Sequence, residues 1–142
     1  MNTKTILATL AGAVYNFLGG WVVFGMVLSG FYHANSKTYE GLVKGEMPDL
    51  AFIFASGIFS AYLVTYLLRR VGKDYDFGTG FKHGLVVYVC MAAWANLSIY
   101  GFYNLLNLTL VFTDVAVQGV FGGINGGIIA LILGSGQRKS NG

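Results

Sequence analysis

The chain has 142 residues, of which 55% are hydrophobic and only 11% are charged, and its mean hydropathy is +0.62. A soluble domain carries about 25% charged residues, so this chain has too little charge to cover a water-soluble globule of its length. The single cysteine excludes a disulfide framework, a four-cysteine zinc site and a dithiol redox pair. The composition therefore predicts a small integral membrane protein. It indicates the lipid environment of the chain more clearly than it indicates a function.

Four apolar stretches are long enough to cross a bilayer, whose core of about 30 Å needs roughly 20 apolar helical residues. They cover approximately residues 5–30, 50–68, 84–103 and 108–134. Four such helices take up nearly the whole chain. We therefore expect one all-α domain over residues 1–142, an integral membrane bundle of four transmembrane helices.

The first stretch has a second interpretation, as a secretory signal peptide with Lys4 as its basic region and Ala11-Gly12-Ala13 as its cleavage site. The apolar segment before that site, Ile6 to Leu10, is shorter than the about 7–15 residues that such a region needs. Hydrophobicity also continues to Gly30. We therefore expect a retained first span.

The lysines and arginines indicate an orientation, because loops on the cytoplasmic side carry an excess of them. In a four-span arrangement seven of the nine fall on one side: Lys4, Arg69, Arg70, Lys73, Lys82, Arg138 and Lys139. The other two, Lys37 and Lys44, share their loop with three carboxylates. This asymmetry predicts that both termini are cytoplasmic (N-in/C-in). It forms no basic cluster on a soluble face, so we expect a lipid bilayer and no nucleic acid as partner.

The connections between the spans show no cofactor or metal motif. The first loop, residues 31–49, carries His33, Glu40, Glu46 and Asp49, but their spacing matches no known metal site. In the second loop, Gly78-Thr79-Gly80 lacks the lysine and the preceding strand of a phosphate loop, so it is interpreted as a turn. We therefore expect no metal and no cofactor.

Polar side chains inside the spans carry the most information, because burying a polar group in hydrocarbon is costly. The candidate polar network consists of Asp114, Asn96, Gln118, Asn16, Asn125 and Tyr100. Counting 1.5 Å per residue from the span ends, we expect two layers. Asp114 would pair with Asn96, within reach of Tyr100. Gln118 would pair with Asn16.

Asp114 is open to two interpretations. An intramembrane carboxyl can be a proton or cation site, and it can equally be a hydrogen-bonded group that fixes helix register. It has no basic partner in the spans.

Small residues predict how the helices pack. At about 100° per residue, Gly119, Gly123 and Gly127 form a ridge on the fourth helix. This ridge is separate from a polar stripe that holds Asp114, Gln118, Gly122 and Asn125. On the first helix, Gly12 and Gly19 share one stripe with Asn16. We expect these glycines to let helices approach closely and the fourth helix to be the most buried.

Several motifs distributed over nearly the whole chain carry a family resemblance. They are Gly19-Gly20-Trp21, Gly25, Phe31-Tyr32, Asn35, Pro48-Asp49, Tyr100-Gly101, Asn104-Leu105, Asn107-Leu108-Thr109, Asp114 and the glycine-rich last helix. With them the chain resembles an uncharacterised family of small four-span bacterial membrane proteins, catalogued as a domain of unknown function. The resemblance implies the four-span topology and the bacterial inner membrane. It implies no catalytic residues.

Two functions are consistent with these observations. The first is a non-enzymatic structural or interaction subunit that assembles with itself or with another membrane protein through small-residue faces. The alternative is a small transporter or channel subunit that uses the polar stripe around Asp114, although no broken helix, internal repeat or basic clamp is visible. An enzyme is not expected, because neither His33 nor His83 has a plausible catalytic partner nearby in the chain.

Overall fold

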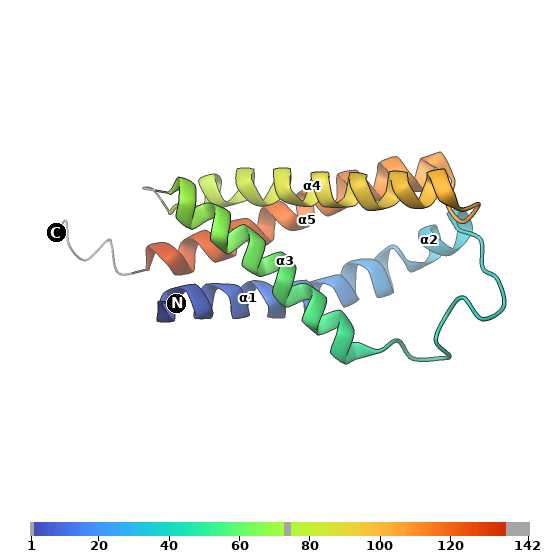
Figure 1. The fold of residues 1–142 in the computed structure, drawn as a ribbon, viewed down its shortest axis with the longest axis horizontal. Coiled ribbons are helices and arrows are strands. Elements are labelled where there is room, and N and C mark those ends of the chain that lie inside the picture. The colour runs from blue at the N-terminus through green and yellow to red at the C-terminus, as the bar shows by residue number, and fades with distance from the viewer. Residues whose placement is uncertain (1, 73–74, 136–142) are drawn as a thin grey trace.

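The computed structural model describes residues 2–72 and 75–135, and within them it is helical without a strand (Figure 1). The elements are α1 (Thr3–Gly20), the π-helix η1 (Trp21–Val27), α2 (Ser29–Asn35), α3 (Leu50–Val71), α4 (Phe77–Phe102) and α5 (Leu108–Gly134). The segments Thr3–Val27, Leu50–Val71, Phe77–Phe102 and Leu108–Gly134 are long and apolar enough to cross a membrane. The expected all-α bundle of four such helices is confirmed. Lys73, Arg138 and Lys139 of the charge count lie outside the described residues.

The four long helices are arranged as an antiparallel pair with two helices laid against it. α4 and α5 run side by side and share the most extensive interface of the bundle. α1 lies along α5, and α3 crosses α1 obliquely (Figure 1). α1 begins at the end of the bundle where α5 stops, and the Lys4 ammonium donates a 2.6 Å hydrogen bond to the Ser135 carbonyl there.

Glycine on both α4 and α5 brings the two backbones into contact. A Cβ added to Gly84 would lie 2.1 Å from the Gly122 carbonyl oxygen, and one on Gly80 would lie 2.2 Å from the Gly126 carbonyl oxygen. Only glycine permits so close an approach, as in small-residue packing of membrane helices generally. α5, the fourth of the long helices, also contains the largest share of buried residues, as expected.

This contact explains why α4 begins earlier than the sequence predicted. The expected turn at Gly78-Thr79-Gly80 is wrong, because these residues form the first turns of α4. Asp76 caps the helix, and its carboxylate accepts a 2.9 Å hydrogen bond from the Thr79 backbone N–H. The glycines serve close packing against α5 there, and they do not mark a chain reversal.

The expected ridge of Gly119, Gly123 and Gly127 also faces α4, but it receives side chains and no backbone. Its neighbours on α4 are Val89, Phe81 and Phe77, respectively. The backbone contact instead uses Gly122 and Gly126, and Gly122 also lies against the Tyr88 ring. All these glycines are therefore engaged within one chain.

The first span is interrupted, in contrast to the single helix expected over residues 5–30. α1 passes into the π-helix at Trp21, where the Leu28 N–H bonds to the Val23 carbonyl at 2.8 Å, five residues back. The helix then breaks at Leu28, whose φ and ψ are −99° and 0°. A Cβ on Gly25 would lie 2.9 Å from the Trp21 ring, so the side chain of Trp21 occupies the space beside Gly25.

The short helix α2 continues in the direction of α1 and contacts the connection between α4 and α5 (Figure 1). Ser36 pairs with Leu106 in an isolated bridge, and the Asn107 side chain donates a 2.8 Å hydrogen bond to the Asn35 side chain. The expected loop of residues 31–49 is therefore wrong at its start, because residues 31–35 are helical and docked.

Candidate functional site

Polar groups of all four long helices meet at Asn16. Its Nδ2 donates to the Ser60 hydroxyl at 2.9 Å and to the Gly57 carbonyl at 3.1 Å, both on α3. Its Oδ1 accepts hydrogen bonds from the Tyr88 hydroxyl of α4 and from Nδ2 of Asn125 of α5, each at 2.8 Å. Asn125 is fully buried, and its Nδ2 also lies 2.8 Å from the Tyr88 hydroxyl. We call Asn16, Ser60, Tyr88 and Asn125 the central cluster.

Glycines make the space for this cluster. A Cβ on Gly122 would lie 2.0 Å from Cγ of Tyr88, so the ring occupies the place that a side chain at 122 would need. Gly57 similarly accommodates Asn16, with a Cβ position 3.3 Å from the Cβ of Asn16. Glycine at positions 57 and 122 therefore leaves room for the side chains of Asn16 and Tyr88 in the central cluster.

The structure brings together Asn16 and Asn125 of the candidate network, but it does not pair Gln118 with Asn16. Tyr88 and Ser60 were missing from that network. The signal for Tyr88 was present, because it lies four residues after Gly84 and thus on the same face of α4.

A second cluster surrounds Asp114, which is only 7% exposed. Its carboxylate accepts hydrogen bonds from the Asn96 amide, as the expected layer required, and from the Tyr32 hydroxyl. The third group is therefore Tyr32 and not Tyr100, which is 43% exposed. After the break at Leu28, α2 places Tyr32 beside the N-terminal part of α5. Sequence depth alone could not indicate this contact.

Both oxygens of the Asp114 carboxylate have partners in the chain. Tyr32 lies beyond the Thr3–Val27 segment, and its pKa is raised by burial and by the adjacent Asp114 carboxylate. The Tyr32 hydroxyl therefore keeps its proton and donates it to the hydrogen bond. As far as the chain is described, no basic side chain pairs with Asp114.

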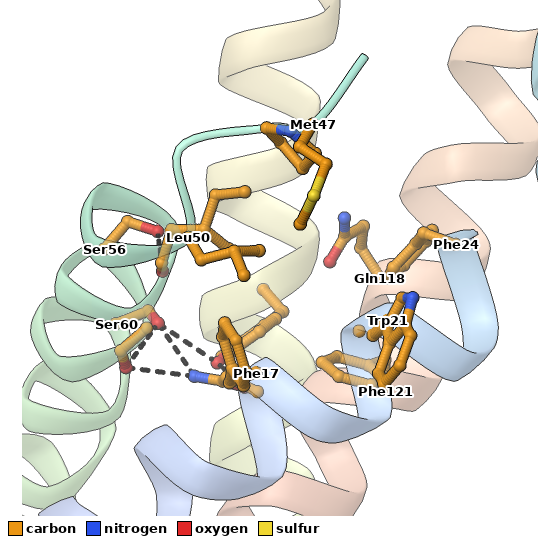
Figure 2. A pocket seen from close by; sticks show the side chains of 15 residues that line it. Phe17, Trp21, Phe24, Met47, Leu50, Ser56, Ser60, Gln118 and Phe121 are labelled. Atoms are coloured by element: carbon orange, nitrogen blue, oxygen red, sulfur yellow. Dashed lines mark hydrogen bonds between the residues drawn. The ribbon is translucent and has the colours of Figure 1, made fainter.

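A pocket of about 680 Å³ opens beside the central cluster, between α1 with η1 on one side and the first half of α3 on the other (Figure 2). Met47 and Pro48 line it from the loop before α3. Its aromatic walls are formed by Phe17, Trp21, Phe24 and Phe121. It is therefore an apolar space with the polar central cluster at one border.

Gln118 contributes a different kind of group to this pocket. Its carboxamide points into the space, toward Met47 (Figure 2). Within residues 2–72 and 75–135 we find no hydrogen bond of this side chain, whereas Ser56 of the same pocket donates to the Ile53 carbonyl of its own helix at 2.8 Å. Gln118 thus offers a donor and an acceptor to a molecule in the pocket. Asp114 does not line this pocket.

The described residues contain no group of three or more His, Cys, Asp or Glu that could hold a metal ion. His83 is engaged with the Thr79 carbonyl of its own helix at 2.8 Å, and Cys90 is exposed. The chemistry available at the central cluster and the pocket is therefore hydrogen bonding and apolar contact.

The chain matches no protein-family model, no curated protein and no solved structure. Its function must therefore be inferred from the geometry of the pocket and the polar clusters.

Proposed function

We propose that this chain is a small, non-enzymatic membrane protein that binds a lipophilic molecule with one hydrogen-bonding group in the pocket between α1 and α3. The observation that carries the proposal is the Gln118 carboxamide, which points into an apolar pocket without a partner among the described residues. Ligand sites typically have volumes of about 300–1,000 Å³ and combine apolar walls with a few polar groups. The pocket has this size and this composition.

The ligand class follows from the groups that face it. A carboxamide can donate to a carbonyl or accept from a hydroxyl, but it offers no charge to an ionic ligand. The flat faces of Phe17, Trp21 and Phe121 favour an apolar or aromatic body. We therefore expect a neutral lipophilic alcohol, ketone or amide.

Assembly through small-residue faces loses its main support, because the glycines along the interface of α4 and α5 pack against residues of the same chain. A homo-oligomer or a complex with another membrane protein would have to use other surfaces.

The alternative, a small transporter or channel subunit, gains one observation from the interrupted first span. Broken helices are typical of transporters, whose binding sites use the freed backbone and the helix ends. In this alternative, separation of Tyr32 from Asp114 would open a polar path near the N-terminal end of α5. Asp114→Asn should then fold and lose proton- or cation-dependent transport in liposomes. Unchanged transport would contradict the alternative and leave the binding proposal intact.

We further propose a bacterial inner membrane location with both termini cytoplasmic, supported by the lysine and arginine asymmetry. In a Cys90→Ala background, a membrane-impermeant maleimide should label Lys37→Cys in spheroplasts and label Lys82→Cys only after lysis. The reverse pattern would overturn the orientation.

The chain contains a natural control for a binding experiment. Trp21 lines the pocket, whereas Trp94 lies on α4 and does not. Trp94→Phe therefore leaves Trp21 as the sole reporter, and Trp21→Phe leaves only the distant indole. The probe is 11-bromoundecanol, which carries a hydroxyl group and a fluorescence-quenching bromine.

We expect saturable quenching of Trp21 and only non-saturable quenching of Trp94. Ser56→Phe, which fills the pocket, should abolish the saturable phase. Gln118→Leu should weaken it by about threefold to tenfold, the value of one neutral hydrogen bond. Identical quenching curves for the two single-tryptophan proteins would contradict the proposal.

A further inference from the structure

A second recess lies at the opposite end of α3, far from the pocket near Met47. It has a volume of about 230 Å³ and is lined by Thr5, Tyr62, Tyr66, Arg69 and Arg70. Thr5 belongs to α1 and the other four belong to α3, so the recess lies between two membrane-spanning helices. Arginines in the last turn of α3 complement the helix dipole. That role alone does not require a recess or the two tyrosines.

The two arginines are held in different ways. The Arg69 guanidinium donates a 2.9 Å hydrogen bond to the Thr5 hydroxyl, which fixes it toward α1. The Arg70 Nε donates to the Tyr66 hydroxyl at 3.2 Å, and its guanidinium lies 5.7 Å from the centre of the Tyr66 ring. Across residues 2–72 and 75–135, neither arginine forms an ion pair with a carboxylate. Their remaining N–H groups are therefore available to an anion.

The shape of the recess specifies the anion further. Tyr62, Tyr66 and Arg70 are spaced four residues apart and lie along one side of α3, and the Tyr62 and Tyr66 rings are 6.4 Å apart. From Arg70 to Tyr62 the recess extends about 12 Å along the helix toward the middle of the span. Charge at the helix end and aromatic surface below it match a molecule with an anionic head and an apolar tail.

We propose that this recess binds the phosphate group of an anionic phospholipid, with the guanidinium groups of Arg69 and Arg70 on the phosphate and the glycerol and first acyl carbons along Tyr62 and Tyr66. Arginine suits this task because its planar fork bonds phosphate oxygens in pairs. Basic recesses between membrane helices bind lipid head groups for the same reason. Inorganic phosphate shares the head-group chemistry but would leave the tyrosine-lined part empty.

The test is native mass spectrometry of the full chain, purified in detergent and titrated with phosphatidylglycerol or with phosphatidylcholine of the same acyl chains. We expect the first phosphatidylglycerol to bind about fivefold tighter than the first phosphatidylcholine. Arg70→Gln should remove this difference. Lys82→Gln, which removes an equal charge from α4 outside the recess, should keep it. Equal loss in both variants, or no preference in the wild type, would overturn the proposal.

Two further arms complete the test. Arg70→Lys keeps the charge and loses the fork, so the preference should fall to an intermediate value. Inorganic phosphate at millimolar concentration should leave bound phosphatidylglycerol in place. Displacement by inorganic phosphate would assign the recess to a soluble anion and overturn the lipid assignment. Circular dichroism of each variant shows that the helices are intact, and Tyr66→Phe provides a second variant that retains both arginines and should weaken binding.

Discussion

Substitution of Gly84 by alanine tests whether the contact between the α4 and α5 backbones holds the bundle together. The added Cβ would lie 2.1 Å from the Gly122 carbonyl oxygen and 2.9 Å from the Gly126 Cα. Ordinary van der Waals contact begins at 3.4 Å, so the two helices must separate locally by about 1.3 Å. The neighbouring atoms belong to a helix backbone and cannot rotate away as a side chain would.

The magnitude follows from two opposing effects. Alanine stabilises a helix interior by about 1 kcal/mol relative to glycine. Overpacking costs about 1–3 kcal/mol, and the rigid backbone of α5 places Gly84 at the upper end of that range. We therefore expect Gly84→Ala to lower the free energy of unfolding by about 2 kcal/mol.

Gly20→Ala is the matched control, because nothing lies within 4 Å of the Cβ position at Gly20. The same substitution there should leave stability unchanged or raise it by up to about 1 kcal/mol. Unfolding of both proteins in dodecylmaltoside with increasing fractions of dodecylsulfate, followed by circular dichroism, measures the difference. Shifts of the same sign and size at Gly84 and Gly20 would refute the close backbone contact.

The remaining predictions concern polar groups and one side-chain contact, and all are measured by the same unfolding experiment. Asp114→Asn should leave the free energy of unfolding nearly unchanged, because an amide can accept from Asn96 and donate to the Tyr32 hydroxyl. Asp114→Leu should lower it by about 1–3 kcal/mol, because both partners are left unpaired. Equal effects of the two substitutions would contradict the hydrogen bonds. Tyr88→Phe should cost about 1–3 kcal/mol, because it strands groups of Asn16 and Asn125, while the exposed Tyr100 tolerates the same change. Gly123→Ala should be milder than Gly84→Ala, since the Phe81 ring that it meets can turn aside. The Thr79 backbone N–H holds the pKa of the exposed Asp76 below its ordinary value of 3.8. Asp76 therefore stabilises the fold above pH 3.8, and this contribution is lost as the pH falls through the lower pKa of the folded state. Over that acid range Asp76→Ala should lose less stability than the wild type.

The sequence predicted well whatever depends on hydropathy and length. The fourth span, expected at residues 108–134, coincides with α5 at Leu108–Gly134. Asn107 explains its sharp start, because the side chain caps the helix by accepting a 2.8 Å hydrogen bond from the Leu110 N–H. The pairing of Asp114 with Asn96 followed from equal depth on two antiparallel neighbours.

What the sequence could not predict depends on contacts between distant segments. Nothing in the uniformly apolar run from Trp21 to Leu28 marks a break, because it contains neither proline nor charge. The π-helix over Trp21–Val27 and the break at Leu28 therefore have no signal in this run. The contact between Tyr32 and Asp114 lies beyond that break. Gly78 and Gly80 were interpreted as turn residues because glycine is equally typical of turns and of close helix contacts, and only the partner helix distinguishes the two.

The polar contacts between α1 and α3 are distributed unevenly along α3. Thr5 bonds to Arg69, Thr9 bonds to Thr65 at 3.2 Å, and Asn16 bonds to Ser60. Before Gly57, within the described chain, no side-chain hydrogen bond joins α3 to another helix, and Phe54 makes apolar contacts with the buried core and an edge contact with Phe17.

α3 is thus joined to α1 by hydrogen bonds over its second half and by apolar contacts alone over its first two turns. Swinging of Leu50–Ser56 would widen or narrow the pocket without breaking a hydrogen bond between helices. The rigid pair of α4 and α5 would keep its geometry throughout. Such a motion would let one pocket accommodate molecules of different width while the bundle itself stays intact.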